Sequence, residues 1–193
     1  MRLPNFEAFF PKLSASGYDK TSDQTGPIGT PGTYNCIAYA ASDTRCWWWP
    51  HPDTYWPPWS NCRDASVKCF VYTFMRLGYW PCKSSRREFG YEKVALYAVH
   101  RSGREMIPPP DWRDLDEWMP KHMARQLPNG SWSSKCGGDE DIMHVTLDAL
   151  DRYGRNGDTQ SAYGCACVYM KRFIPMGRVV GLLQRILWKF EKV

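Results

Sequence analysis

The chain has no long apolar run and no signal-peptide pattern. No stretch approaches the ~18 consecutive apolar residues that would span a bilayer. Pro4, Glu7 and Pro11 interrupt the apolar segment at the start, whereas a secretory leader needs an uninterrupted apolar core. We therefore expect a soluble protein of the cytoplasm without a membrane span, or one exported by a leaderless route.

An excess of charge of one sign is also missing. Lys and Arg number 25 against 20 Asp and Glu, and the net charge of +5 is spread along 193 residues. Basic residues form only short groups such as SSRREF and HRSGRE, whereas nucleic-acid-binding tails concentrate them. The sequence therefore gives no strong nucleic-acid signal.

Closely paired metal ligands are lacking as well. Zinc sites usually show two short Cys or His spacings. The tightest pair here, Cys165 and Cys167, alternates like one face of a strand. His51, Cys136 and His144 could contribute to a dispersed site, but their spacing does not require one. We therefore predict no metal and no cofactor. A small zinc-stabilised module is kept as the last of three hypotheses, after the two functional ones given at the end of this subsection.

Cysteine itself is abundant, with eight residues. An even count suits disulfides, but a chain without a secretion signal keeps most thiols reduced. Cys62 and Cys69 are seven apart, as on one face of a helix. Cys36 follows a Gly/Pro-rich stretch, and its role could be buried filler, disulfide half, metal ligand or nucleophile.

Glycine and proline mark the organisation of the chain. Residues 1–32 are rich in both and predict an N-terminal arm wrapped on one domain over 33–175. Residues 176–193 have apolar side chains at helical spacing with Arg and Lys between them. We expect an amphipathic helix there, docked on the domain or on a protein partner rather than on a membrane.

Aromatic residues are frequent, with ten Trp and eleven Tyr. The segment CWWWPHPDTYWPPW is predicted to be an irregular loop that its prolines make rigid. Trp47, Trp48, Trp49 and Trp56 would either wall a substrate groove or cover the core.

Local patterns predict helices first and an antiparallel sheet afterwards. Apolar spacing over 65–77, with Asp64 as N-cap and Gly78 as stop, predicts a core-packing helix. This order of elements indicates the α+β class. The other predicted elements are a short helix over 36–44, a strand over 91–100, a hairpin over 121–135, a strand end or short helix over 141–150 and a last strand over 164–173.

A nucleophilic site can be assembled from these elements. A helix N-terminus favours the thiolate form of cysteine, and Cys36 begins the first predicted helix. Such a nucleophile needs a base, most often histidine. We choose His122 among the four histidines because it lies on a strand that a hairpin pairs with SWSSK.

Strand parity selects a third residue. With Asn129-Gly130 as a two-residue loop, Gln126 opposes Ser133, and His122 then shares a face with Ser133 while Ser134 points away. Ser133 could accept a hydrogen bond from the imidazole and orient it. A one-residue bulge would exchange Ser133 for Ser134, and Asp141 is a further candidate.

Several blocks resemble an uncharacterised family of small, mainly bacterial proteins. Over roughly residues 33–155 the family reads N-C-I-A-x-A, W-W-W-P, E-K-V-A-L-Y-A, H-x-A-R-Q-L and W-x-S-K-x-G, here YNCIAYA, WWWP, EKVALYA, HMARQL and WSSKCG. Met123 stands where the family tends to have Ala, and the cysteines at 46, 69, 136, 165 and 167 are additional.

The family layout is similar to the papain-like superfamily that includes NlpC-type peptidases. The resemblance implies a core of N-terminal helices packed on a small antiparallel sheet, with Cys36 as nucleophile and His122 as base. It also implies an oxyanion site made by the backbone N–H of Cys36 and the Asn35 side chain.

Two functional hypotheses follow. The first is a cysteine hydrolase, such as a thiol protease, or an acyltransferase, acting on a peptide, amide or ester through Cys36 and His122. The second is a non-catalytic interaction protein of a toxin, defence or phage-type assembly, using the aromatic loop and the C-terminal helix. The alternative to both is a purely structural role, in which Cys36 and His122 are ordinary core residues.

Overall fold

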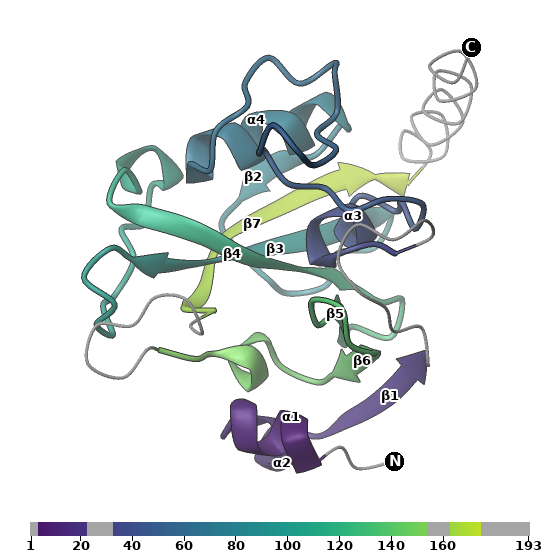
Figure 1. Ribbon diagram of the computed structural model, residues 1–193. Helices are drawn as coiled ribbons and strands as arrows, with labels where there is room; N and C mark the ends of the chain where they lie inside the picture. The colour runs from purple at the N-terminus through teal and green to yellow at the C-terminus, as the bar shows by residue number, and fades with distance from the viewer. Residues whose placement is uncertain (1–3, 23–32, 154–162, 175–193) are drawn as a thin grey trace.

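The computed structural model describes residues 4–22, 33–153 and 163–174, and one antiparallel sheet dominates it (Figure 1). Seven strands lie in the order β1-β6-β5-β4-β3-β7-β2, with antiparallel neighbours throughout. The strands are β1 (Tyr18–Ser22), β2 (Trp80–Cys82), β3 (Tyr91–His100), β4 (Trp118–Gln126), β5 (Trp132–Lys135), β6 (Asp141–His144) and β7 (Cys165–Phe173).

The described helices are short. They are α1 (Pro4–Phe9), α2 (Leu13–Ser16), α3 (Cys36–Ala40), α4 (Val67–Arg76) and the 3-10 turns η1 (Trp112–Asp114) and η2 (Leu147–Leu150). The predicted helix over 65–77 is confirmed as α4, although Ser66 rather than Asp64 caps it, accepting a hydrogen bond from the Cys69 N–H. Among the described residues, no helix is long and apolar enough to cross a bilayer.

The expected papain-like core of helices packed on a small sheet is wrong. The protein is mainly a seven-stranded sheet with few short helices. Strands β1, β2 and β6 have only three to five residues, too few for a clear period-two pattern, and β2 contains a proline. Pairing with distant partners, which local sequence does not encode, turns these segments into strands. The predicted helix over 176–193 lies outside the described residues.

Alternating side chains of the central strands enter two different cores. Leu96 of β3 and Met123 of β4 pack in the core that contains α3 and α4. Their neighbours Tyr97 and Ala124 pack in the other core, with Phe10 of the N-terminal arm. This alternation is what a sheet covered on both sides requires. In Figure 1, α4 and the α1–α2 pair accordingly lie on opposite sides of the sheet.

The aromatic loop (residues 46–59) covers the first core. Trp48 and Trp56 are buried. The Trp48 indole N–H donates to Asp43, and that of Trp56 donates to the Cys62 carbonyl. Trp49 is partly buried and packs edge-on against Phe70 of α4. Most tryptophans of this loop therefore cover the core, and this agrees with the second of the two interpretations and not with a substrate groove.

One disulfide joins Cys62 to Cys69. The expectation of mostly reduced thiols fits the other six cysteines, which are free, but fails for this pair. The link ties the end of the aromatic-loop region to the first turn of α4. A spacing of seven along the chain suits this loop-to-helix connection as well as a helical face.

Candidate functional site

Asn35 fixes the start of the helix that carries Cys36. Its side-chain oxygen accepts from the N–H groups of Ala38 and Trp48, at 3.1 and 3.3 Å. Its amide nitrogen donates to the Trp48 carbonyl at 2.6 Å. Asn35 is therefore the N-cap of α3 and joins it to the aromatic loop. These bonds occupy the side chain that we expected to serve an oxyanion.

The environment of Cys36 differs from the expected thiolate site. Burial raises the pKa of the Cys36 thiol to about 11, and the backbone amides of Met123, Ile37 and Cys36 itself offset only part of that rise. The five-residue helix α3 supplies too little field to overcome desolvation. Cys36 is therefore a neutral thiol at pH 7, and a base must take its proton before or during attack.

Strand β4 carries His122 next to the residue whose amide interacts with the Cys36 sulfur, but the side chains of Cys36 and His122 enter different cores. Cys36 packs in the core that contains Met123, whereas His122 packs against Tyr97 and Tyr163 of the other core. The Met123 amide, which interacts with the Cys36 sulfur, belongs to the residue directly after His122. Strands β4 and β5 pair only at Arg125↔Ser133 and Gln126↔Trp132. Helix α3 packs on both strands.

Ser134, not Ser133, is the partner of His122. The Nε2 atom of His122 lies 2.9 Å from the Ser134 hydroxyl, and both side chains are fully buried. Ser133 instead bonds the Tyr39 hydroxyl at 2.8 Å. The predicted parity is therefore wrong by one residue, in the way that a bulge in the hairpin would produce.

The hairpin turn explains this shift. Gly130 donates to the Leu127 carbonyl, and Leu127 donates to the Ser131 carbonyl, so three residues form the loop. Pro128 occupies the second position of the turn, where its fixed φ excludes the two-residue type I′ turn. Gly130 then takes a positive φ of 93° as a G1-type bulge. The extra loop residue turns Ser134 toward His122.

A second histidine continues the chain of hydrogen bonds. Ser134 Oγ lies 2.9 Å from His144 Nε2. The other ring nitrogen of His144, Nδ1, lies 2.7 Å from the Thr146 carbonyl. Burial lowers the pKa of His122 well below its ordinary value and lowers that of His144 to about 4. Both imidazoles are therefore neutral at pH 7.

The sequence did not place His144 near Ser134, because its segment fits a strand end or a short helix equally well. The pairing Trp132↔His144 puts this histidine on the same face as Ser134, two residues along β5. Pairing of DIMH as a strand with WSSK would have predicted that His144 lies beside Ser134.

Aromatic rings enclose the imidazole of His122. Tyr163 stacks on it with centroids 4.5 Å apart, and Tyr97 meets it edge-on at 5.3 Å. The Nδ1 atom of His122 is buried and has no hydrogen-bond partner among the described residues. Most buried polar atoms are paired. This basic nitrogen is therefore an exception that calls for an explanation.

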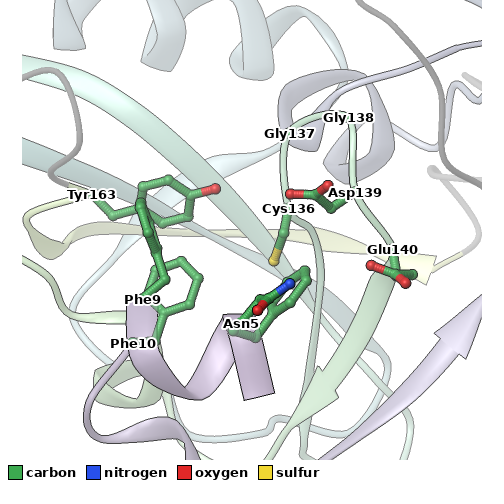
Figure 2. A pocket seen from close by; sticks show the side chains of 10 residues that line it. Asn5, Phe9, Phe10, Cys136, Gly137, Gly138, Asp139, Glu140 and Tyr163 are labelled. Carbon is green, nitrogen blue, oxygen red and sulfur yellow. The ribbon is translucent and has the colours of Figure 1, made fainter. Parts of the chain in front are cut away.

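A pocket of about 700 Å³ opens beside Tyr163 (Figure 2). Rings of the N-terminal arm and Tyr163 form one wall, and the β5–β6 turn forms the other. The Cys136 sulfur points into the space between them. The lining residues are Asn5, Phe6, Phe9, Phe10, Cys136, Gly137, Gly138, Asp139, Glu140 and Tyr163.

The remaining candidate residues lie apart from this pocket. Asp141 accepts from the Tyr34 hydroxyl at 2.7 Å and lies 3.7 Å from Lys135 Nζ, so it is not a partner of His122. Trp48 and Trp49 pack in the core on the other side of the sheet, and neither they nor Trp47 line the pocket. The structure does not bring these tryptophans to His122.

One group of metal-type side chains occurs among the described residues. Donor atoms of Cys62, Asp64 and Cys69 lie within 4.8 Å of one another. The two sulfurs are joined in the disulfide and cannot act as thiolate ligands in that state.

The fold and the site define an antiparallel-sheet protein with a buried histidine–serine–histidine chain. A family model described as "Domain of unknown function (DUF7689)" matches residues 25–171, and the chain belongs to this family. The match includes Cys36, His122, Ser134 and His144, and it begins after α1, α2 and β1. No curated protein and no solved structure matches the chain.

Proposed function

We propose that the protein is a cysteine-dependent hydrolase or acyltransferase that acts on an amide or ester. Cys36 is the nucleophile, His122 the base and Ser134 the group that orients the base. The observation that carries this proposal is the unpartnered Nδ1 of His122, one residue before the Met123 amide that interacts with the Cys36 sulfur. A base held through one nitrogen and free at the other is the arrangement that nucleophilic catalysis requires.

The two neutral groups define the order of proton transfer. As the Cys36 sulfur bonds to the carbonyl carbon, its proton passes to Nδ1 of His122, and the carbonyl oxygen becomes an oxyanion. The backbone N–H groups of Cys36 and Ile37 at the start of α3 would donate to that oxygen. His122 then protonates the leaving amine or alcohol as the carbon–heteroatom bond breaks. Water or an amine attacks the thioester and gives its proton to His122, and His122 returns that proton to the sulfur as the carbon–sulfur bond breaks, which restores the neutral thiol.

The pocket beside Tyr163 is the proposed site for the acyl donor. Its volume of about 700 Å³ lies within the range of small-molecule sites. Tyr163 belongs both to the pocket wall and to the stack on His122. A substrate in the pocket would therefore contact the ring that now covers the base.

An activated ester tests the proposal without knowledge of the natural substrate. The protein is treated with p-nitrophenyl acetate at pH 7.5, and acetylated cysteines are mapped by mass spectrometry. We expect acetylation at Cys36 that is about 10²-fold or more slower in His122→Gln, whose amide can still donate to Ser134 but cannot act as a base. Cys36→Ser should abolish the adduct.

Cys167→Ser is the matched control, because Cys167 is a partly buried free thiol on β7 whose sulfur donates to the Leu96 carbonyl. It should leave the Cys36 rate unchanged. Equal acetylation of all thiols, or no loss in His122→Gln, would reject the proposal.

An interaction protein remains the second candidate, and one observation favours it. Tyr72 and Trp80 are 49% and 58% exposed beside a second pocket that also contains Met75 and Arg76. Large aromatic and Arg side chains of this kind dominate protein–protein contacts. If Cys36 is not acetylated, this surface of α4 and β2 becomes the better basis for a function.

A further inference from the structure

The direction of the histidine–serine–histidine chain follows from its last member. The Thr146 carbonyl can only accept a hydrogen bond, so the Nδ1 atom of His144, at 2.7 Å, carries the proton. A neutral imidazole carries one N–H, and burial keeps His144 neutral at pH 7 by lowering its pKa to about 4. The Nε2 atom of His144 is therefore an acceptor.

Ser134 fixes the donor and acceptor of the next hydrogen bond. Its hydroxyl has one hydrogen, and the acceptor Nε2 of His144 at 2.9 Å takes it. Toward His122, the Ser134 oxygen can then only accept. The His122 Nε2 atom, also at 2.9 Å, must donate. Because burial keeps His122 neutral as well, its Nδ1 atom carries a lone pair and no proton.

The other tautomer of His122 leaves more polar groups without a hydrogen bond. With the proton on Nδ1 of His122, two acceptor nitrogens would face the single hydrogen of Ser134. The Nδ1–H would also be buried without an acceptor among the described residues. An unmade bond and an unsatisfied donor both cost free energy in a buried site.

We infer that His144, held by the Thr146 carbonyl, is a positioning residue that selects the tautomer of His122 in which Nδ1 is the basic nitrogen. The tautomer of His122 follows from the hydrogen bonds together with the neutral state of both buried rings. The statement that it serves catalysis rests on the proposed function, because only the Nδ1 lone pair can take a proton from Cys36.

The tautomers can be read directly from the full chain labelled with ¹⁵N-histidine. Long-range ¹H–¹⁵N correlation at pH 7.5 distinguishes the protonated from the unprotonated nitrogen in each of the four rings. We expect His122 with its proton on Nε2 and His144 with its proton on Nδ1. A proton on Nδ1 of His122 in the wild-type protein would overturn the inference by itself.

Two substitutions of His144 separate positioning from packing. In His144→Gln the amide oxygen can still accept from Ser134, so His122 should keep its tautomer. In His144→Leu no acceptor remains, the Ser134 hydroxyl is free to donate to His122, and the Nδ1–H form should gain population. An unchanged His122 tautomer in a folded His144→Leu variant would contradict the inference.

Acetylation of Cys36 distinguishes this inference from the proposed function. If both hold, His144→Leu slows acetylation about 10²-fold or more and His144→Gln largely restores the rate. If the expected tautomers are found but wild-type Cys36 is not acetylated, the proposed function fails and the positioning role in the tautomer stands. If Cys36 is acetylated while His122 carries its proton on Nδ1, the inference fails together with the role of His122 as base, and only the dependence on Cys36 stands.

Discussion

At Cys36, two effects act on the thiol in opposite directions. The helix start and three backbone amides favour the thiolate, and removal from water favours the thiol. Desolvation is the larger effect, because the charged form of a buried group loses its whole hydration shell. The reactivity proposed for Cys36 would therefore depend on a base at the moment of attack and not on a low pKa of the thiol.

Alkylation checks this directly. With a pKa of about 11, Cys36 should react with iodoacetamide at pH 8 about 10²-fold more slowly than an ordinary thiol with a pKa near 8.5. Its rate should still rise about tenfold per pH unit between pH 8 and 10, where an ordinary thiol levels off. Peptide mapping after timed quenching gives both rates, and fast labelling of Cys36 at pH 7 would refute the expectation.

The buried histidines should make stability depend on pH. Their folded pKa values lie below the ordinary value of 6.5, so the unfolded chain takes up protons first as the pH falls. The contribution is fully present above pH 6.5 and is lost as the pH falls toward the folded values. For His144, with a folded pKa of about 4, the loss between pH 7.5 and pH 4 is about 3 kcal/mol.

Urea unfolding at pH 7.5, 5.5 and 4.5 measures this dependence. His144→Gln should flatten the slope, whereas His51→Gln, at an exposed position, should not change it. Asp151 has the opposite effect on stability. Burial raises its pKa to about 6, so its contribution to stability grows as the pH falls. The comparison of the variants separates the effect of His144 from that of Asp151. An unchanged slope in His144→Gln would contradict the assignment.

At the scale of elements, the hairpin between β4 and β5 decides which serine meets His122. The sequence pattern Pro128-Asn129-Gly130 contained this information, because proline at the second turn position favours a three-residue loop with a left-handed glycine. The hairpin and α4 could be predicted because their signals are local. The predicted register is wrong because Pro128 does not fit the two-residue loop on which that register depends.

Other parts of the site could not be predicted from local sequence. β6 becomes a strand only through its pairing with β5 and β1, and without it His144 has no place. The pKa of Cys36 depends on how deeply α3 is buried, which is a property of the whole core. The papain-like expectation failed for the same reason, since three short strands widen the sheet.

The turn glycine should be sensitive to substitution. Gly130→Ala places a side chain at a φ of 93° and should lower the free energy of unfolding by about 1–2 kcal/mol. Gly138→Ala is the control, because Gly138 does not have a positive φ. Chemical denaturation of both variants measures the difference. Equal stability of the two would show that the bulge does not set the hairpin.

At the scale of the molecule, the N-terminal arm completes the second core. Phe10 and Leu13 are buried there with Tyr97 and Trp132 of the sheet. The same arm forms the aromatic wall of the pocket. The family match begins at residue 25, so α1, whose residues line this pocket, lies outside it.

Removal of one arm side chain should therefore destabilise the whole protein. Phe10 is 2% exposed, and Phe10→Ala should cost about 3–5 kcal/mol through lost burial and the cavity that remains. Phe89 is 95% exposed, and Phe89→Ala should change stability by less than about 0.5 kcal/mol. Thermal and urea unfolding compare them, and a small effect of Phe10→Ala would mean that the arm is not part of the folding unit.

The two outermost strands also limit how copies of this protein can associate. β1 carries Asp19 and Lys20 and has an irregular register after Lys20, while β2 has three residues and includes Pro81, which has no N–H to offer. Such strands are poor templates for another chain. Growth of the described sheet into fibres by strand addition is therefore disfavoured at both margins, and we expect it to require loss of β1 or β2.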